Sequence, residues 1–194
     1  MDWSVILSSC IVAATTIISL FLKDFLQKKK NQASLSVEKC TIQNANVEKA
    51  IRYALDSVNA DRVSVYEFHN GESFYSGSHQ QKFSCTYETV KTGVSSEALN
   101  LQGLRISTFN QFISEVINNK IFQFSDIKTI EDSLLRNWFE NRGIKSAYSI
   151  PIITLNKNII GVINVEHTGK THKPTEKDIK FLIEQSKIIC GYLI

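Results

Sequence analysis

Residues 148–167 read YSIPIITLNKNIIGVINVEH, a sequence with two clear strand signals. Two runs rich in β-branched residues, 148–154 and 159–167, flank the polar sequence LNKN, a pattern typical of an antiparallel hairpin. Proline lacks the N–H that a ladder hydrogen bond needs, so Pro151 is expected at a sheet edge or at a non-bonded position. The stretch therefore predicts two neighbouring strands of an antiparallel sheet.

The segments on either side of the hairpin alternate between helical and strand patterns. Apolar residues recur at helical spacing over 46–58 and again over 176–193, which predicts a helix at each end of the domain. The predicted order is helix, two strands, helix, strand, helix, hairpin and helix. Helices at both ends of an antiparallel sheet predict an α+β fold with three layers, in which helices sandwich the sheet.

Turn and cap signals predict where several elements begin or end. The first strand, in RVSVYEFHNG, is expected to close in a turn at Asn70-Gly71, because this dipeptide favours positive φ. Thr108 with Gln111 makes a capping-box pattern that predicts the start of the next helix. Thr175 is predicted to cap the last helix in the same way.

The N-terminal residues read as a separate unit. Residues 3–22 carry no charge over a length that, as a helix, matches the hydrocarbon core of a bilayer. A signal peptide would carry basic residues before its apolar run, whereas here Asp2 precedes it and lysines follow. The positive-inside rule predicts a single-pass anchor in the inner or plasma membrane, with the C-terminal domain cytoplasmic. The predicted organisation is an anchor with a basic flank over 1–30, a linker over 31–44 and a domain over 45–194.

Composition excludes several classes of protein. Charged residues make up 21% and hydrophobic residues 43%, which excludes a disordered chain. The four cysteines show neither CxxC nor zinc-site spacing, which argues against a disulfide scaffold or a structural zinc. Two of the three excess positive charges lie in residues 1–30, so the domain itself is nearly neutral. Its arginines are scattered, and nucleic acid is therefore not expected as a partner.

Four motifs in a fixed order resemble those of one family. They are DRVSVY at 61–66, GIKS leading into YSIPI at 143–152, IGVINV at 160–165, and TEKD followed by FL at 175–182. With these motifs the chain over 45–194 resembles a GAF domain, and its HNG sequence is similar to a branch found in small bacterial and phage proteins. The resemblance implies an antiparallel sheet sandwiched by helices, a ligand pocket over one face of the sheet, and a homodimer formed through the terminal helices.

The resemblance leaves the ligand and any cofactor unknown. Relatives that bind cyclic nucleotides carry an Asn-Lys…Phe…Asp-Glu signature, which Asn119-Lys120, Phe122 and Asp126 do not reproduce at the required spacing. Relatives that reduce methionine sulfoxide need several pocket cysteines, whereas the middle of this domain offers Cys85. Bilin attachment needs a cysteine context that Cys85, on a predicted strand, does not supply.

Two acid–imidazole pairs are the candidate chemical groups. Glu67 and His69 share one face of a predicted strand, where they either face a polar pocket or form a structural hydrogen-bonded pair. Glu166 and His167 end the second strand of the hairpin, and by alternation one of the two can face the pocket. If the strands are neighbours, the pairs could meet as an acid–base or metal site. The other histidines lie in predicted loops, and no metal site is predicted.

Further candidates come from the loops and from the aromatic residues of the first two strands. Arg105 precedes a predicted helix and either binds an anionic ligand or makes a surface ion pair. The aromatic residues form core or line an apolar pocket. The predicted ligand-binding set is Glu67, His69, Asn70, Tyr87, Arg105 and Glu166.

The leading hypothesis is a membrane-anchored, cytoplasm-facing GAF-like domain that binds a small ligand, dimerises, or does both, without catalysis. The chain ends inside its last predicted helix, so a separate protein partner is expected to carry the output. One alternative is a small hydrolytic or redox enzyme that uses Glu67, His69 and Glu166. The other is a structural membrane adaptor that binds no ligand.

Overall fold

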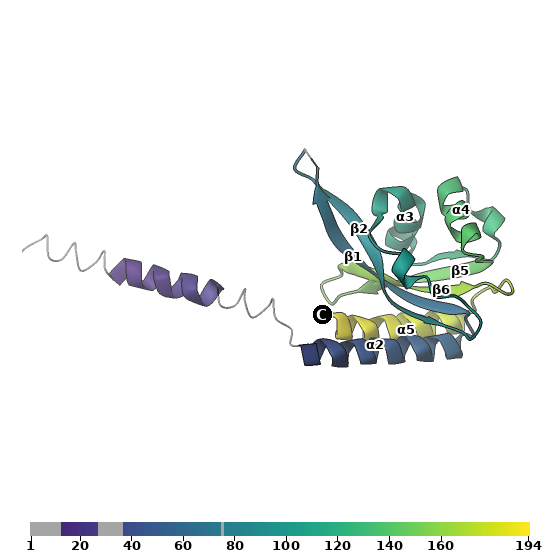
Figure 1. The fold of residues 1–194 in the computed structure, drawn as a ribbon, viewed down its shortest axis with the longest axis horizontal. Helices are drawn as coiled ribbons and strands as arrows, with labels where there is room; N and C mark the ends of the chain where they lie inside the picture. The colour runs from purple at the N-terminus through teal and green to yellow at the C-terminus, as the bar shows by residue number, and fades with distance from the viewer. Residues whose placement is uncertain (1–12, 27–36, 75) are drawn as a thin grey trace, which may run out of the picture. The chain divides into compact units, whose positions relative to one another are not determined.

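The computed structural model describes residues 13–26, 37–74 and 76–194, which belong to two units (Figure 1). The first unit is Met1–Ile42 and the second is Gln43–Ile194. The elements of the second unit follow the predicted order, with one additional short strand. The domain therefore has the α+β class that the sequence predicts.

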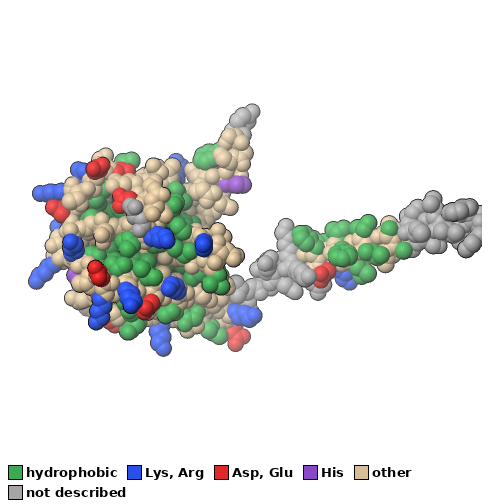
Figure 2. Space-filling model, turned by 180° about the vertical axis from the view of Figure 1, so that it is seen from behind, with side chains coloured by type: hydrophobic (Ala, Val, Ile, Leu, Met, Phe, Trp, Pro, Cys, Tyr) green, Lys and Arg blue, Asp and Glu red, His purple; other side chains and the backbone are tan. Residues whose placement is uncertain are grey.

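Residues 13–26 form a helix whose large apolar side chains are all exposed (Figure 2). No helix in the described part of the chain is long and apolar enough to cross a membrane. The predicted span of residues 3–22 falls partly on residues 3–12, which lie outside the described residues. The lysine cluster and the start of the predicted linker, within 27–36, also lie outside them.

A six-stranded antiparallel sheet forms the centre of the second unit, with strand order β3-β2-β1-β6-β5-β4. The predicted hairpin is confirmed, because β5 and β6 pair with Tyr148 opposite Val165. The strands are β1 (Arg62–Ser73), β2 (His79–Val90), β3 (Leu104–Arg105), β4 (Phe122–Phe124), β5 (Ser146–Ile153) and β6 (Ile159–His167).

Helices cover both faces of this sheet, which confirms the predicted sandwich (Figure 1). The helices α2 and α5 lie side by side on one face, and their apolar residues pack with Val63 and Val65. The helices α3 and α4 cover the other face and pack with Tyr66 and Val162. These helices are α2 (Val37–Ser57), α3 (Asn110–Asn119), α4 (Ser133–Asn141) and α5 (Glu176–Leu193).

Strand β1 separates two kinds of environment. Val63 and Val65 pack in the cluster under α2 and α5, whereas Tyr66 packs in the cluster under α3 and α4. Because side chains alternate along a strand, Arg62 and Ser64 point to the same side as Tyr66. All five residues are buried. The strand thus presents a purely apolar face to one helical layer and a partly polar face to the other.

The turn predicted at Asn70-Gly71 is wrong. The strand continues to Ser73, with Asn70 opposite Gln81, and the chain turns where the Phe74 N–H donates to the Ser78 carbonyl oxygen at 2.7 Å. A Cβ at Gly71 would lie 2.9 Å from the Gln80 carbonyl oxygen, so glycine serves here for close approach of two strands. The strands β1 and β2 consequently extend beyond the body of the domain (Figure 1).

The cap signals were right at one helix and wrong at another. Thr175 caps α5 in a reciprocal capping box with Asp178, as predicted. Helix α3 instead begins at Asn110 after a 3-10 turn, η2 (Ile106–Phe109), and no side chain caps it. The side chain of Gln111 is engaged elsewhere, because it accepts a hydrogen bond from the Asp132 N–H at 3.1 Å.

Candidate ligand site

The structure keeps the two predicted acid–imidazole pairs apart. Glu67 and His69 alternate with Tyr66, so they point to the opposite face of the sheet from Tyr66. Glu67 lies opposite Gly161, five residues from Glu166 along β6, a separation of roughly 16 Å. An acid–base site built from Glu67, His69 and Glu166 is therefore not assembled.

The other predicted site residues are also dispersed. The Nε2 of His69 lies 2.9 Å from the hydroxyl of Ser84, so this histidine has a structural partner. Asn70 accepts a hydrogen bond from a side chain of β2, and the Tyr87 hydroxyl donates to a side chain of α2. Arg105 is exposed on β3. Of the predicted set, Glu166 is the member that lies in a buried cluster of charges.

Glu166 is the centre of this buried charged cluster, with a side chain that is 0% exposed. The Nη1 of Arg62 and the Nη2 of Arg142 donate to the same carboxylate oxygen, Oε2, at 2.7 and 2.8 Å. The Nδ2 of Asn164 donates to the other oxygen, Oε1, at 2.8 Å. The carboxylate is thereby fixed between two guanidinium groups.

Glu88, on β2, extends the buried charged cluster to the neighbouring loop. Its Oε1 lies 3.2 Å from the Nε of Arg62. Its Oε2 accepts hydrogen bonds from the backbone N–H groups of Glu97 and Ala98 at 2.8 and 3.2 Å. Arg62 also donates through Nη2 to the Ser95 carbonyl oxygen at 2.6 Å. Charge-assisted hydrogen bonds thus hold the 95–98 loop beside the cluster.

Polar groups without a hydrogen-bond partner are found on Arg142 and on Tyr66, whose side chain lies on the same face of the sheet and is counted with the buried charged cluster. The hydroxyl of Tyr66 and the Nε and Nη1 groups of Arg142 are buried and make no hydrogen bond to any described residue. Burial and the charge of Glu166 raise the pKa of Tyr66, so its hydroxyl remains a neutral donor and acceptor. Burial alone would lower the pKa of Arg142, but Glu166 raises it above its ordinary value, and the guanidinium stays charged.

The charges of the buried charged cluster balance. Arg62 and Arg142 supply two positive charges, and Glu88 and Glu166 supply two negative ones, all on side chains that are at most 7% exposed. The guanidinium of Arg142 also lies over the ring of Trp138, 4.4 Å from its centroid. A charged molecule placed here would add a buried charge without a counterion, which is costly. The arrangement therefore suits an uncharged polar molecule.

Cys85 lies on the same face of the sheet with its side chain buried. Burial first and the charge of Glu88 second raise the pKa of its thiol to about 12. Its Sγ donates a weak hydrogen bond to the Tyr87 carbonyl oxygen at 3.4 Å. The side chain consequently stays a protonated thiol. Within the described ranges, no group of three or more His, Cys, Asp or Glu side chains is placed to hold a metal ion.

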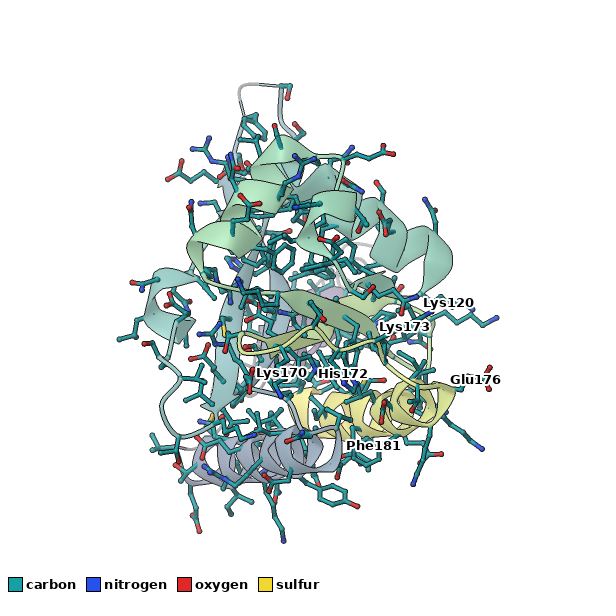
Figure 3. All side chains as sticks on the ribbon, turned by 90° about the vertical axis from the view of Figure 1, so that its right-hand side faces the viewer. Lys120, Lys170, His172, Lys173, Glu176 and Phe181 are labelled. Carbon is teal, nitrogen blue, oxygen red and sulfur yellow. The ribbon has the colours of Figure 1, made fainter. Side chains whose placement is uncertain are left out.

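His167 lines a pocket at the end of the sheet, away from the buried charged cluster. Because Glu166 points toward Tyr66, alternation directs His167 to the opposite face, as the sequence pattern required. Its ring centroid lies 4.6 Å from that of His172, with the two rings tilted. It lies 6.1 Å from that of Tyr148, on which the ring stacks. Burial, with a smaller contribution from His172, lowers the pKa of His167 to about 4. The loop with Lys170 and His172 lines this pocket of about 320 Å³ (Figure 3).

Sequence reasoning missed Arg62, Tyr66 and Arg142 as site residues. A signal for the first two exists, because Arg62, Ser64 and Tyr66 alternate with valines in an otherwise apolar strand. A buried strand that places an arginine on one face must pair it with an acid. Arg142 gives no such signal, since it follows the last residue of α4 and resembles an ordinary C-terminal cap.

Comparisons with known proteins identify the fold. A family model described as "GAF domain" matches residues 45–186. The PixJ GAF domain of Thermosynechococcus elongatus is 15% identical with a TM-score of 0.66, covering 82% of this chain and 89% of that one.

Two further solved structures share the fold at low identity. The GAF region of a putative membrane protein of Geobacter sulfurreducens is 14% identical with a TM-score of 0.57, covering 80% of this chain and 95% of that one. The phycocyanobilin-bound GAF domain of a cyanobacterial phytochrome is 15% identical with a TM-score of 0.60, covering 86% and 88%. No curated protein shows significant sequence similarity to the chain.

Proposed function

The chain belongs to the GAF domain family, and we propose that it is a non-catalytic sensory domain that binds a small uncharged polar ligand at the buried charged cluster. One observation carries the proposal: Tyr66 and Arg142 bury an O–H and two guanidinium nitrogens that no described residue pairs. Buried polar groups are rarely left unpaired, and each one costs about 1–3 kcal/mol. A ligand with acceptor and donor groups would pair them.

The surroundings of the cluster limit the size of any ligand. The layer between the sheet and the helices α3 and α4 is filled with aromatic side chains, and Phe83 makes edge-to-face contacts with both Tyr66 and Phe109. Some structural relatives carry bilins, but the protonated, buried thiol of Cys85 does not favour covalent attachment of such a group. The proposed ligand is therefore a molecule much smaller than a bilin that carries carbonyl or hydroxyl groups.

We propose a non-catalytic role because the acidic side chains are poorly placed for acid–base chemistry. Both oxygens of Glu166 already accept hydrogen bonds from guanidinium or amide groups, so its carboxylate is poorly placed to accept a proton. Glu67 and His69 lie on the other face of the sheet. Sensing through a change in hydrogen bonding is the function that this geometry supports best.

Replacing Tyr66 with phenylalanine tests the proposed site. Because the hydroxyl has no partner in the domain, we expect Tyr66→Phe to leave the ligand-free chain as stable as the wild type, or up to about 1 kcal/mol more stable. The small molecule that native mass spectrometry detects on the full wild-type chain, purified from cell extract, should be lost or strongly reduced in this variant.

Tyr148→Phe is the matched control for this experiment. The Tyr148 hydroxyl is also buried without a partner among the described residues, but its ring packs in the cluster under α2 and α5. This variant should retain the bound molecule. A wild-type chain that carries no small molecule, or equal retention by the two variants, would contradict the proposal.

We further propose that residues 3–22 anchor the domain in a membrane with the domain on the cytoplasmic side. The support is the uncharged run with lysines after it, and a helix at 13–26 whose large apolar side chains are all exposed. The full chain should stay with the membrane pellet after alkaline carbonate extraction, and protease added to intact cells should leave the domain uncut. Release into the carbonate supernatant would refute the anchor.

A further inference from the structure

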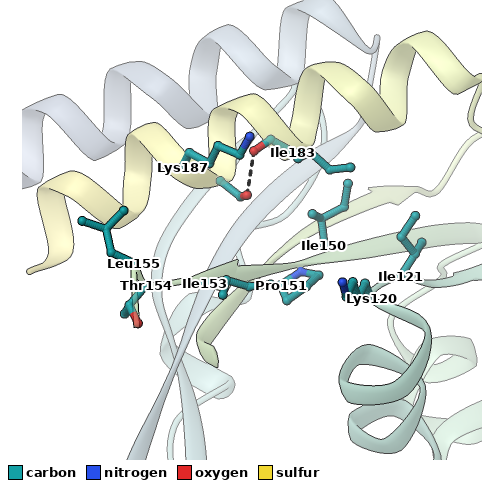
Figure 4. A pocket seen from close by; sticks show the side chains of 10 residues that line it. Lys120, Ile121, Ile150, Pro151, Ile153, Thr154, Leu155, Ile183 and Lys187 are labelled. Carbon is teal, nitrogen blue, oxygen red and sulfur yellow. Dashed lines mark hydrogen bonds between the residues drawn. The ribbon is translucent and has the colours of Figure 1, made fainter. Parts of the chain in front are cut away.

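An apolar groove of about 630 Å³ lies between helix α5 and the edge of strand β5 (Figure 4). Strand β4 pairs with Ala147 to Ser149, and beyond that point β5 has no neighbour on this side among the described strands. Isoleucines from three segments face the groove: Ile121 after α3, Ile150 and Ile153 on β5, and Ile183 on α5. We name this feature the edge groove.

The hydroxyl groups that line the edge groove are already engaged. The Oγ of Ser186 donates to the Ile183 carbonyl oxygen at 2.9 Å, and this bond is drawn in Figure 4. The Oγ1 of Thr154 accepts a hydrogen bond from the Asn158 N–H at 3.1 Å. The wall of the groove therefore offers little to a polar molecule, and the body of a bound ligand has to be apolar.

Two lysines supply positive charge at the edge groove. Lys120 ends α3, and Lys187 lies on α5 (Figure 4). Both are exposed, and neither makes an ion pair with a described carboxylate. A ligand with an anionic end would pair with one of these ammonium groups while its apolar part stays against the isoleucines. Lysine favours this arrangement because its long stem lies along apolar surface and its charge stays in water.

We propose that the edge groove binds a long-chain anionic amphiphile of the fatty-acid class. The volume lies within the roughly 300–1,000 Å³ typical of small-molecule sites. A peptide added as a strand at this edge would lose a hydrogen bond, because Pro151 has no N–H to donate, and an acyl chain needs none. The edge groove shares no residue with the buried charged cluster, so this inference stands or falls independently of the proposed sensory site.

Photolabelling of the full chain tests the inference. The probe is palmitate with a diazirine at the end of its acyl chain, and tandem mass spectrometry maps the labelled residues. We expect labels on α5 around Ile183 and on β5 around Ile153. Unlabelled palmitate should compete, and methyl palmitate, which lacks the negative charge, should compete at least about fivefold more weakly.

Lysine variants separate charge recognition from non-specific apolar binding. Lys120→Gln and Lys187→Gln should each weaken labelling about two- to fivefold, as expected for an exposed charge pair. Lys180→Gln, an exposed position on α5 that does not line the groove, is the matched control and should leave labelling unchanged. The proposal would be overturned if methyl palmitate competed as well as palmitate, or if the three variants had equal effects on labelling. It would also be overturned if labelling of the groove disappeared when the chain self-associated.

Discussion

Glu166→Gln should lower the free energy of unfolding by about 3–5 kcal/mol. The carboxylate that it removes pairs with Arg62 and Arg142, whose side chains are only 2% and 7% exposed. Breaking a buried pair leaves uncompensated charge in a poorly solvated site, and that cost exceeds the loss of one hydrogen bond. Here a single substitution leaves two arginines under-paired, so we expect the upper part of the range.

Urea unfolding of the full chain, followed by circular dichroism, measures this effect. Glu184→Gln is the matched control, because Glu184 lies exposed on α5 and forms no ion pair with a described residue. That variant should stay within about 0.5 kcal/mol of the wild type. Similar midpoints for the two variants would show that the buried charged cluster contributes little to stability.

Gly161→Ala is the second substitution with a large expected effect. A Cβ at Gly161 would lie 2.2 Å from the carbonyl oxygen of Tyr66, on the neighbouring strand. The contact is with backbone, which no rotamer change relieves, so β1 and β6 would have to separate locally. Overpacking of a core typically costs about 1–3 kcal/mol, and we expect about 3 kcal/mol or more here.

Gly191→Ala provides the opposite control. Gly191 lies in α5, and a Cβ there would meet nothing within 4 Å. Because alanine favours helix over glycine, this variant should be more stable by about 0.5–1 kcal/mol. Thermal unfolding of the two variants should therefore give shifts of opposite sign. Shifts of the same sign would contradict the steric argument.

Short-range patterns in the sequence were enough to predict most of the fold. The hairpin of β5 and β6 is specified by two β-branched runs around the short connection LNKN, and the cap of α5 by Thr175 and Asp178. Both signals act over a few residues, so no distant contact overrides them. The turn predicted at Asn70-Gly71 failed for the opposite reason, because pairing with β2, with Asn70 opposite Gln81, continues the strand through a dipeptide that favours a turn.

The buried charged cluster was beyond such reasoning, because its members come together through sheet register. Arg62 meets Glu166 only because β1 pairs with β6 in the register that places these residues opposite each other. Glu88 and Arg142 arrive from two further segments of the chain. Periodicity assigns a residue to a face, but it does not say which residue of another strand lies beside it.

The two-sided character of β1 bears on how the domain could pass on a signal. Tyr66 and Arg62 belong to the buried charged cluster, and Val63 and Val65, between them in sequence, pack under α2 and α5. Because side chains alternate along a strand, neighbouring residues of β1 contact the buried charged cluster on one face and the two helices on the other. Helix α2 precedes β1 directly and runs back toward the N-terminus. In the proposed sensory function, a change in hydrogen bonding at Arg62 or Tyr66 would therefore reach the packing of α2 and α5 through β1 itself.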